Sequence, residues 1–248
     1  MRNEKTFAII IPARYESSRF PGKPLADICG KPMIQHVWER CCLAVGRAKV
    51  YIATDCDMIL NVAIEFGAKV VLTSSNCLTG TDRLAEANKL LNCDFVVNVQ
   101  GDEPLINPND ILTVIDEYIK KPETVINAMC PIIYENEFRS FTVPKVVASK
   151  SGNLLYISRS PIPVSKTNSF SFGFKQVCIY AFSKSHLEFF ASHQQKTPIE
   201  QVEDIEILRF LENDIPVKMV TVESTSIAVD IPSDLEKVVE YISNHHCE

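Results

Sequence analysis

The stretch IIPARYESSRFPGKPL, residues 10–25, decides how this chain of 248 residues folds. Its apolar start is typical of a buried strand, and the polar loop after it carries three cations, Arg14, Arg19 and Lys23. Two guanidinium groups and an ammonium group, beside two serines and a glycine, are suited to phosphate oxygens. A solvated basic loop is the alternative, but the order of strand, P-A-R, S-R-x-P-G-K-P and helix favours a phosphate site. The stretch matches neither GxGxxG nor GxxxxGK[ST].

Strand and helix patterns alternate on both sides of this loop. Short β-branched runs predict strands at residues 7–11, 50–54, 69–72 and 95–99. Apolar residues spaced three and four apart predict helices at residues 33–41, 59–66, 84–91 and 111–119. This alternation predicts an α/β fold with right-handed crossovers and a mostly parallel sheet. Ligands of such sheets bind at the carboxyl ends of the strands.

Strand patterns dominate after residue 119. We expect strands at residues 125–133, 145–149, 154–158, 176–182, 217–222 and 227–229, and helices at residues 187–192, 199–213 and 235–242. The charges between Glu200 and Arg209 are interpreted as helix surface, with Glu206 as the exception. Since no linker divides the chain, we predict one domain over residues 1–248. A strand-rich lobe, a candidate dimerisation arm, is inserted at roughly residues 125–183.

Composition excludes several classes of protein. Hydrophobic residues make up 46% and charged residues 23%, as in globular proteins, and the net charge is −6. A broad nucleic-acid surface needs a basic surplus, so we expect no nucleic-acid partner. No apolar run is long enough to span a membrane, and the N-terminus is no convincing signal peptide. Nine cysteines without a CxxC motif favour a reducing, cytoplasmic location.

Two predicted strands end in aspartate. NVQGDEP, residues 98–104, places Asp102 after a strand, and IAVDIP, residues 227–232, places Asp230 in the same way. Carboxylates at such positions are suited to Mg²⁺, which prefers oxygen ligands and accompanies phosphates. Turn formation and a helix start are the simpler interpretations. TGTDR, residues 79–83, opens a helix whose N-terminus is suited to a carboxylate or phosphate.

Together these motifs resemble the 3-deoxy-manno-octulosonate (Kdo) cytidylyltransferases, also called CMP-Kdo synthetases. The resemblance covers nearly the whole chain: residues 10–37, YIATD, TGTDRLAEA, VNVQGDEPLI, KVV, YISRSPIP, IYAF, EQVEDIEILR and VDIPSDLEKV. It implies a Rossmann-like nucleotide-diphospho-sugar transferase fold with a lobe that makes a homodimer. It also implies a reaction of CTP with a 3-deoxy-2-ulosonic acid and Mg²⁺ that gives the CMP-sugar and pyrophosphate, for lipopolysaccharide or capsule synthesis.

The resemblance also assigns roles to residues. It places Arg14, Arg19 and Lys23 on the CTP phosphates. Around the nucleotide it places Pro12, Ala13, Thr54, Asp55, Ser74 and Ser75. Around the sugar it places Arg83, on the sugar carboxylate, Gln100, Arg159, Gln176, Tyr180 and Glu206. It assigns Mg²⁺ to Asp102 and Asp230, and catalysis to Arg14, Lys23, Asp102 and Asp230.

One departure from the family pattern bears on the sugar, and Lys175 in place of arginine is a milder change. Where relatives have R-H-L-G-I-Y, this chain has KQVCIY, so the histidine that faces the sugar is Gln176. Glutamine donates and accepts hydrogen bonds but carries no proton as imidazole does. The sugar is therefore Kdo, an amino-substituted Kdo or another ulosonic acid. A cytidylyltransferase for a nonulosonic acid and a non-catalytic nucleotide-binding homologue remain as alternatives, whereas the loop expected of a sugar-phosphate nucleotidylyltransferase is absent.

Overall fold

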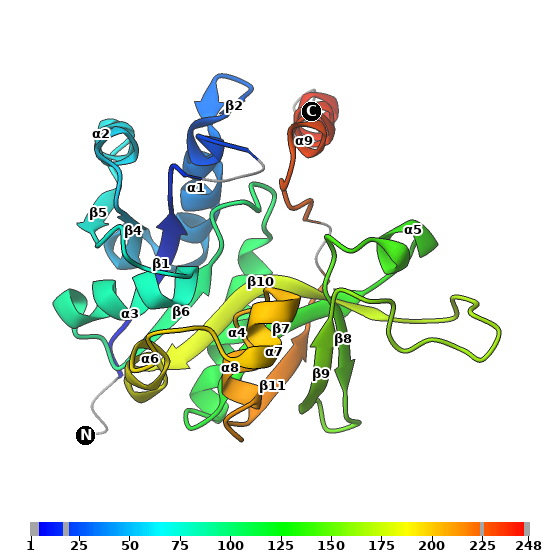
Figure 1. Ribbon diagram of the computed structural model, residues 1–248. Helices are drawn as coiled ribbons and strands as arrows, with labels where there is room; N and C mark the ends of the chain where they lie inside the picture. Colours follow the sequence, from blue (N-terminus) through cyan, green and yellow to red (C-terminus); the bar gives the residue numbers. More distant parts are fainter. Residues whose placement is uncertain (1–4, 17–19, 224–225, 246–248) are drawn as a thin grey trace.

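Four parallel strands form one half of the central sheet. The computed structural model describes residues 5–16, 20–223 and 226–245, and Figure 1 shows the sheet running through its centre. The order in this half is β6-β1-β4-β5. The strands are β1 (Phe7–Ala13), β4 (Val50–Thr54), β5 (Lys69–Leu72) and β6 (Phe95–Val99). All four were predicted, because each is a short, largely β-branched run.

The other half of the sheet is mixed. Here β10 lies between β6 and β7 and is antiparallel to both, while β11 is parallel to β7. These strands are β7 (Val125–Pro131), β10 (Phe174–Ser183) and β11 (Val217–Thr221). The reversal at β10 sets the end of β6 beside the middle of an antiparallel strand, with Val99 opposite Ile179. The fold is the mixed, mostly parallel α/β sheet that the sequence predicts.

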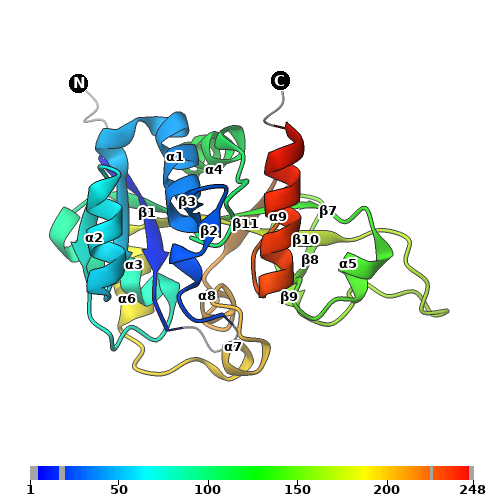
Figure 2. The same ribbon diagram turned by 90° about the horizontal axis from the view of Figure 1, so that it is seen from above.

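Helices cover both faces of the sheet. Alternate residues of β1 separate the two cores: Ile9 and Ile11 pack with α1 and α4, and Ala8 and Ile10 pack with α3 and α6. The helices are α1 (Met33–Val45), α2 (Asp57–Glu65), α3 (Gly80–Leu91), α4 (Pro108–Lys120) and α6 (Lys184–Ala191). Figure 2 shows α1 and α4 on one side of β1 and α3 and α6 on the other. Short elements join them: η1 (Lys23–Leu25), β2 (Asp27–Ile28), β3 (Lys31–Pro32) and η2 (Arg47–Lys49).

A small lobe projects from the mixed half. It contains α5 (Glu135–Arg139), β8 (Lys145–Ala148), β9 (Leu154–Ser158) and the loop that leads into β10. Strand β8 pairs with β9 and with the start of β10. The predicted lobe at residues 125–183 therefore also supplies β7 and β10 to the central sheet, and only the part between them projects.

Two expected elements were wrong. The helix at residues 199–213 is two short helices, α7 (Pro198–Glu203) and α8 (Leu208–Leu211), because Asp204 adopts a left-handed φ of 52°. Residues 227–229 form no strand; instead the Val229 N–H donates to the Asp102 carbonyl over 2.9 Å, just before α9 (Pro232–His245). In the described ranges no helix has the length and apolar character to cross a membrane.

Candidate active site

Two adjoining cavities lie at the carboxyl ends of β1 and β6. The larger has a volume of about 540 Å³ and reaches from Asp102 to the projecting lobe. The smaller, about 220 Å³, lies against the loop after β1 and the start of α3. Five residues line both: Gln100, Asp102, Asp204, Glu206 and Asp230. The site is therefore one divided pocket at the edge where α/β sheets bind ligands.

Asp102, Asp230 and Lys23 meet where the cavities join. The Lys23 ammonium donates to Asp102 Oδ2 and to the Val229 carbonyl, both over 2.9 Å. The backbone bond from Val229 to Asp102 brings Asp230 to the same cavity wall, although the two aspartates are 128 positions apart in the sequence. A carboxylate and a carbonyl thus already hold one cation here. The two predicted carboxylates line the same two cavities, and their role in metal binding stays a prediction.

Two glycines allow this approach. Gly22 has a φ of +70°, a left-handed conformation that suits glycine, and it directs Lys23 into the pocket. A Cβ on Gly101 would lie 3.1 Å from the Pro12 carbonyl oxygen, so the turn after β6 packs closely on the end of β1. The predicted residues Pro12, Ala13 and Arg14 line the smaller cavity with Lys23. Arg19 lies outside the described residues.

The Arg83 guanidinium is already paired. It donates to Asp55 Oδ2 over 2.8 Å and to Thr73 Oγ1 over 2.5 Å, and only 3% of the residue is exposed. It borders the smaller cavity, so a sugar carboxylate there would share this arginine with Asp55. Of the other residues assigned to the nucleotide, neither cavity is lined by Thr54, Asp55, Ser74 or Ser75. Their role stays a prediction.

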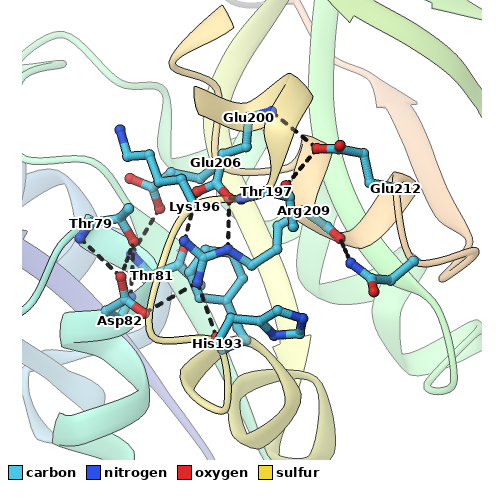
Figure 3. Close-up of polar contacts among 12 residues, drawn as sticks. Thr79, Thr81, Asp82, His193, Lys196, Thr197, Glu200, Glu206, Arg209 and Glu212 are labelled. Carbon is cyan, nitrogen blue, oxygen red and sulfur yellow. Dashed lines mark hydrogen bonds and ion pairs between the residues drawn. The ribbon is translucent and has the colours of Figure 1, made fainter. Parts of the chain in front are cut away.

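The predicted anion site at the start of α3 is occupied by a side chain of the chain itself. Glu206 accepts from the Gly80 N–H over 3.0 Å. It also accepts from the Thr81 N–H over 2.8 Å, and Figure 3 shows Thr81 beside it. Burial raises the pKa of the Glu206 carboxyl above its usual range, and these hydrogen bonds oppose that shift. A carboxylate is stabilised at a helix N-terminus by free N–H groups and the helix dipole. Glu206 thus joins the wall of the pocket to α3.

Behind Glu206 lies a buried ion pair that the sequence analysis missed. Arg209 donates to both oxygens of Glu200 over 2.7 Å, and neither side chain is exposed (Figure 3). Arg209 also donates to the Phe190 carbonyl over 3.0 Å and lies 3.5 Å from Asp82. The interpretation of these charges as helix surface was wrong, because the break at Asp204 folds α8 back onto α7 and α6. No spacing in the sequence signals that break.

The sugar-side predictions lie along the larger cavity. It is lined by Gln100, Arg159, Gln176, Tyr180 and Glu206. The Arg159 guanidinium donates to backbone carbonyls of Glu203, Phe141 and Asp204, so it ties the lobe to α7. Burial raises the pKa of the Tyr180 hydroxyl far above its usual range, which keeps it a neutral hydrogen-bonding group.

Glu103 is a further pocket residue that the sequence analysis did not single out. It is 5% exposed, and its Oε1 accepts from the Cys178 N–H of β10 over 2.9 Å. Burial raises the pKa of its carboxyl, and the Cys178 N–H opposes that shift. The signal was present, since Glu103 directly follows Asp102 in a turn, but its partner is 75 residues away.

Comparisons with known proteins find relatives along nearly the whole chain. A family model described as cytidylyltransferase matches residues 8–245. A 3-deoxy-manno-octulosonate cytidylyltransferase of Geobacter sulfurreducens is 43% identical over 243 residues, which cover 93% of this chain and 97% of the relative. An 8-amino-3,8-dideoxy-manno-octulosonate cytidylyltransferase of Shewanella sp. (strain W3-18-1) is 42% identical over 234 residues, which cover 92% of this chain and 95% of the relative. The solved structure of a CMP:2-keto-3-deoxy-manno-octonic acid synthetase complexed with CTP matches with a TM-score of 0.88 and 37% identity. The match covers 96% of this chain and 99% of that structure's chain.

Proposed function

The chain belongs to the cytidylyltransferase family and is a nucleotidyltransferase, and on that premise we propose that it transfers CMP from CTP to a 3-deoxy-2-ulosonic acid, Kdo. The products are CMP-Kdo and pyrophosphate. One observation carries the proposal: a phosphate-type loop and a large polar cavity meet at Asp102 and Asp230. Two substrates that react at one point need two adjoining subsites. Kdo and its 8-amino analogue are the sugars in the names of relatives of comparable identity.

In the proposed reaction the anomeric hydroxyl of the sugar attacks the α-phosphorus of CTP in line. A new oxygen–phosphorus bond forms and the bond from the α-phosphorus to the β-phosphate oxygen breaks. Pyrophosphate leaves with the electron pair, and the hydroxyl proton passes to water. Arg14 and Lys23 border the smaller cavity, where they would neutralise the triphosphate. Gln100 and Tyr180 border the larger cavity, where they would orient the sugar.

The pocket fits the Mg²⁺ that the resemblance implies. Mg²⁺ is usually held by one or two carboxylates, waters and substrate phosphates, and Asp102 and Asp230 provide two carboxylates beside the phosphate-type loop. The ammonium held between Asp102 and the Val229 carbonyl supports a site for positive charge. When bound there, the ion would offset triphosphate charge and lower the pKa of a bound oxygen.

The test is pyrophosphate release from the purified chain with CTP and Mg²⁺. The sugar panel holds Kdo, 8-amino-Kdo and a nonulosonic acid, and ATP, GTP and UTP replace CTP in controls. We expect release with CTP and Kdo. Release with the nonulosonic acid alone would identify that acid, and not Kdo, as the substrate. CTP binding without pyrophosphate release from any acid would favour a non-catalytic homologue.

We also propose that the chain is a cytoplasmic homodimer whose product serves lipopolysaccharide or capsule synthesis. Large apolar side chains are exposed on the projecting lobe, at Ile133, Tyr134, Phe141, Leu155 and Phe172. Exposed apolar surface of this kind is typical of interaction surfaces. Light scattering after size exclusion should give twice the chain mass of 27.9 kDa, and a monomer at micromolar concentration would refute the dimer.

A further inference from the structure

Strand β10 is interrupted where it borders the larger cavity. Its register with β7 shifts between Val177 and Tyr180, so the ordinary ladder is broken there. The Asn127 side chain, on β7, replaces the missing bonds: its Nδ2 donates to the carbonyls of Val177 and Ile179, both over 3.0 Å. Asn127 has no exposed surface. A buried amide is therefore part of the backbone bonding of this bulge.

These bonds fix the orientation of two side-chain amides in turn. A carbonyl oxygen only accepts, so the Asn127 atom that faces Val177 and Ile179 has to be the NH₂ group. Its Oδ1 is then the atom that faces Gln176, over 2.9 Å, and the Gln176 atom in that contact has to be Nε2. The Gln176 carbonyl oxygen Oε1 is left for the cavity that Gln176 lines, and no described residue donates to it.

We infer that Asn127 is a positioning residue that makes Gln176 present its carbonyl oxygen, a hydrogen-bond acceptor, to the sugar subsite. The group recognised there is a hydrogen-bond donor on the ulosonic acid, either a hydroxyl or an ammonium. This inference rests on the proposed function and deepens it. It states the chemistry at the position where glutamine stands in place of the histidine of the family pattern, and it predicts that Asn127, which lies outside the cavity lining, affects sugar choice.

The first experiment measures kcat/KM for Kdo, 7-deoxy-Kdo, 8-deoxy-Kdo and 8-amino-Kdo in the wild type and in Gln176→Met. Methionine fills a similar volume but accepts hydrogen bonds only weakly. In the wild type, kcat/KM for one of the deoxy analogues should be about 10- to 100-fold lower than for Kdo, because that analogue leaves the Gln176 acceptor unpaired. In the variant that analogue and its parent should react equally, while KM for CTP stays the same. Unchanged discrimination in the variant would overturn the inference.

Two further variants answer two separate questions. Gln176→Glu tests whether the donor on the sugar is a hydroxyl or an ammonium, and Asn127→Ala tests the role of Asn127. Gln176→Glu keeps an acceptor but loses the donor to Asn127, so it should favour 8-amino-Kdo over Kdo if an ammonium is recognised and not if a hydroxyl is. Asn127→Ala should abolish the discrimination among sugars without a change in KM for CTP. If that variant does not fold, Gln176→Met and Gln176→Glu still decide the inference.

A second readout needs no turnover. The side-chain ¹⁵N resonance of Gln176, assigned by its loss in Gln176→Met, should show protons protected from solvent exchange. Fast exchange, as in a solvated amide, would show that Nε2 is not bonded to Asn127 and would overturn the inference. If the resonance is protected but no sugar reacts, the proposed function fails and the amide assignment stands.

Discussion

The two sides of the pocket are built differently. On the side of the loop after β1, Arg14 is exposed and Lys23 is held by one carboxylate and one carbonyl. On the opposite side, Glu206, Arg209, Glu200 and Lys145 are buried or half-buried, and each makes at least two hydrogen bonds within the protein. We call these the loop side and the buried side.

This difference matches what each side would have to do. A triphosphate brings much negative charge, and solvated cations can reach it from several directions. A sugar is distinguished by hydroxyl positions, which requires hydrogen-bonding groups that do not move. Changes on the buried side should therefore cost stability first, and changes on the loop side should cost rate first.

The largest effect on stability is expected for Arg209→Met. Removal of Arg209 leaves the Glu200 carboxylate buried without its partner. We expect this to lower the free energy of unfolding by about 3–5 kcal/mol. Urea unfolding measures this. The double variant Arg209→Met/Glu200→Gln should recover part of the loss, because no buried charge remains.

A matched exposed pair provides the control. Lys31 lies 2.9 Å from Glu39, and both side chains are more than one third exposed. Lys31→Met should therefore change the free energy of unfolding by less than about 1 kcal/mol. An Arg209→Met variant as stable as Lys31→Met would contradict the assignment of a buried side.

The largest effect on rate is expected for Asp230→Asn. The amide keeps the shape but removes the negative charge, and we expect kcat to fall about 100- to 1000-fold. CTP affinity should stay largely intact, because Arg14 and Lys23 line the same cavity. Asp116→Asn, on the exposed face of α4, is the matched control and should leave both unchanged. An unchanged kcat in Asp230→Asn would remove this residue from the catalytic group.

The same division explains what the sequence could predict. The loop side was predictable, because the strand, the cations and Asp102 lie in short continuous motifs next to strand ends. Asp230 was found for the same reason, although the expected strand before it is absent. The buried side was largely missed, because Asn127 and Arg209 act through partners 49 or more residues away or across a chain reversal at Asp204. Only the resemblance pointed to Glu206.

A smaller effect is expected for Lys145→Met. The Lys145 ammonium is fully buried and donates to the carbonyls of Ser140 and Val143, each over 2.7 Å, and to that of Arg159. Loss of the ammonium leaves these carbonyl acceptors unpaired, which should lower the free energy of unfolding by about 1–3 kcal/mol. Urea unfolding at neutral pH measures this difference.

The effect of Lys145 should also depend on pH. Burial lowers the pKa of Lys145 to about 8, and the charge of Arg159 adds to that shift. Between pH 8 and the ordinary value of 10.5 the unfolded chain binds more protons here, so wild-type stability gains with rising pH. Lys145→Met lacks this gain, and the difference between the two proteins should widen from pH 8 to pH 10. A constant or shrinking difference would contradict the lowered pKa.

The smallest effect is expected for Thr79→Ala at the start of α3. Thr79 Oγ1 accepts from the Asp82 N–H over 3.2 Å, and loss of such a cap costs about 0.5–2 kcal/mol. Glu206 independently holds the N–H groups of Gly80 and Thr81, so the helix end stays partly satisfied and the loss should fall near the lower limit. Thr79→Ser keeps the hydroxyl and should unfold at the wild-type urea concentration. A loss above about 2 kcal/mol for Thr79→Ala would mean that Glu206 caps α3 less effectively than its two hydrogen bonds indicate.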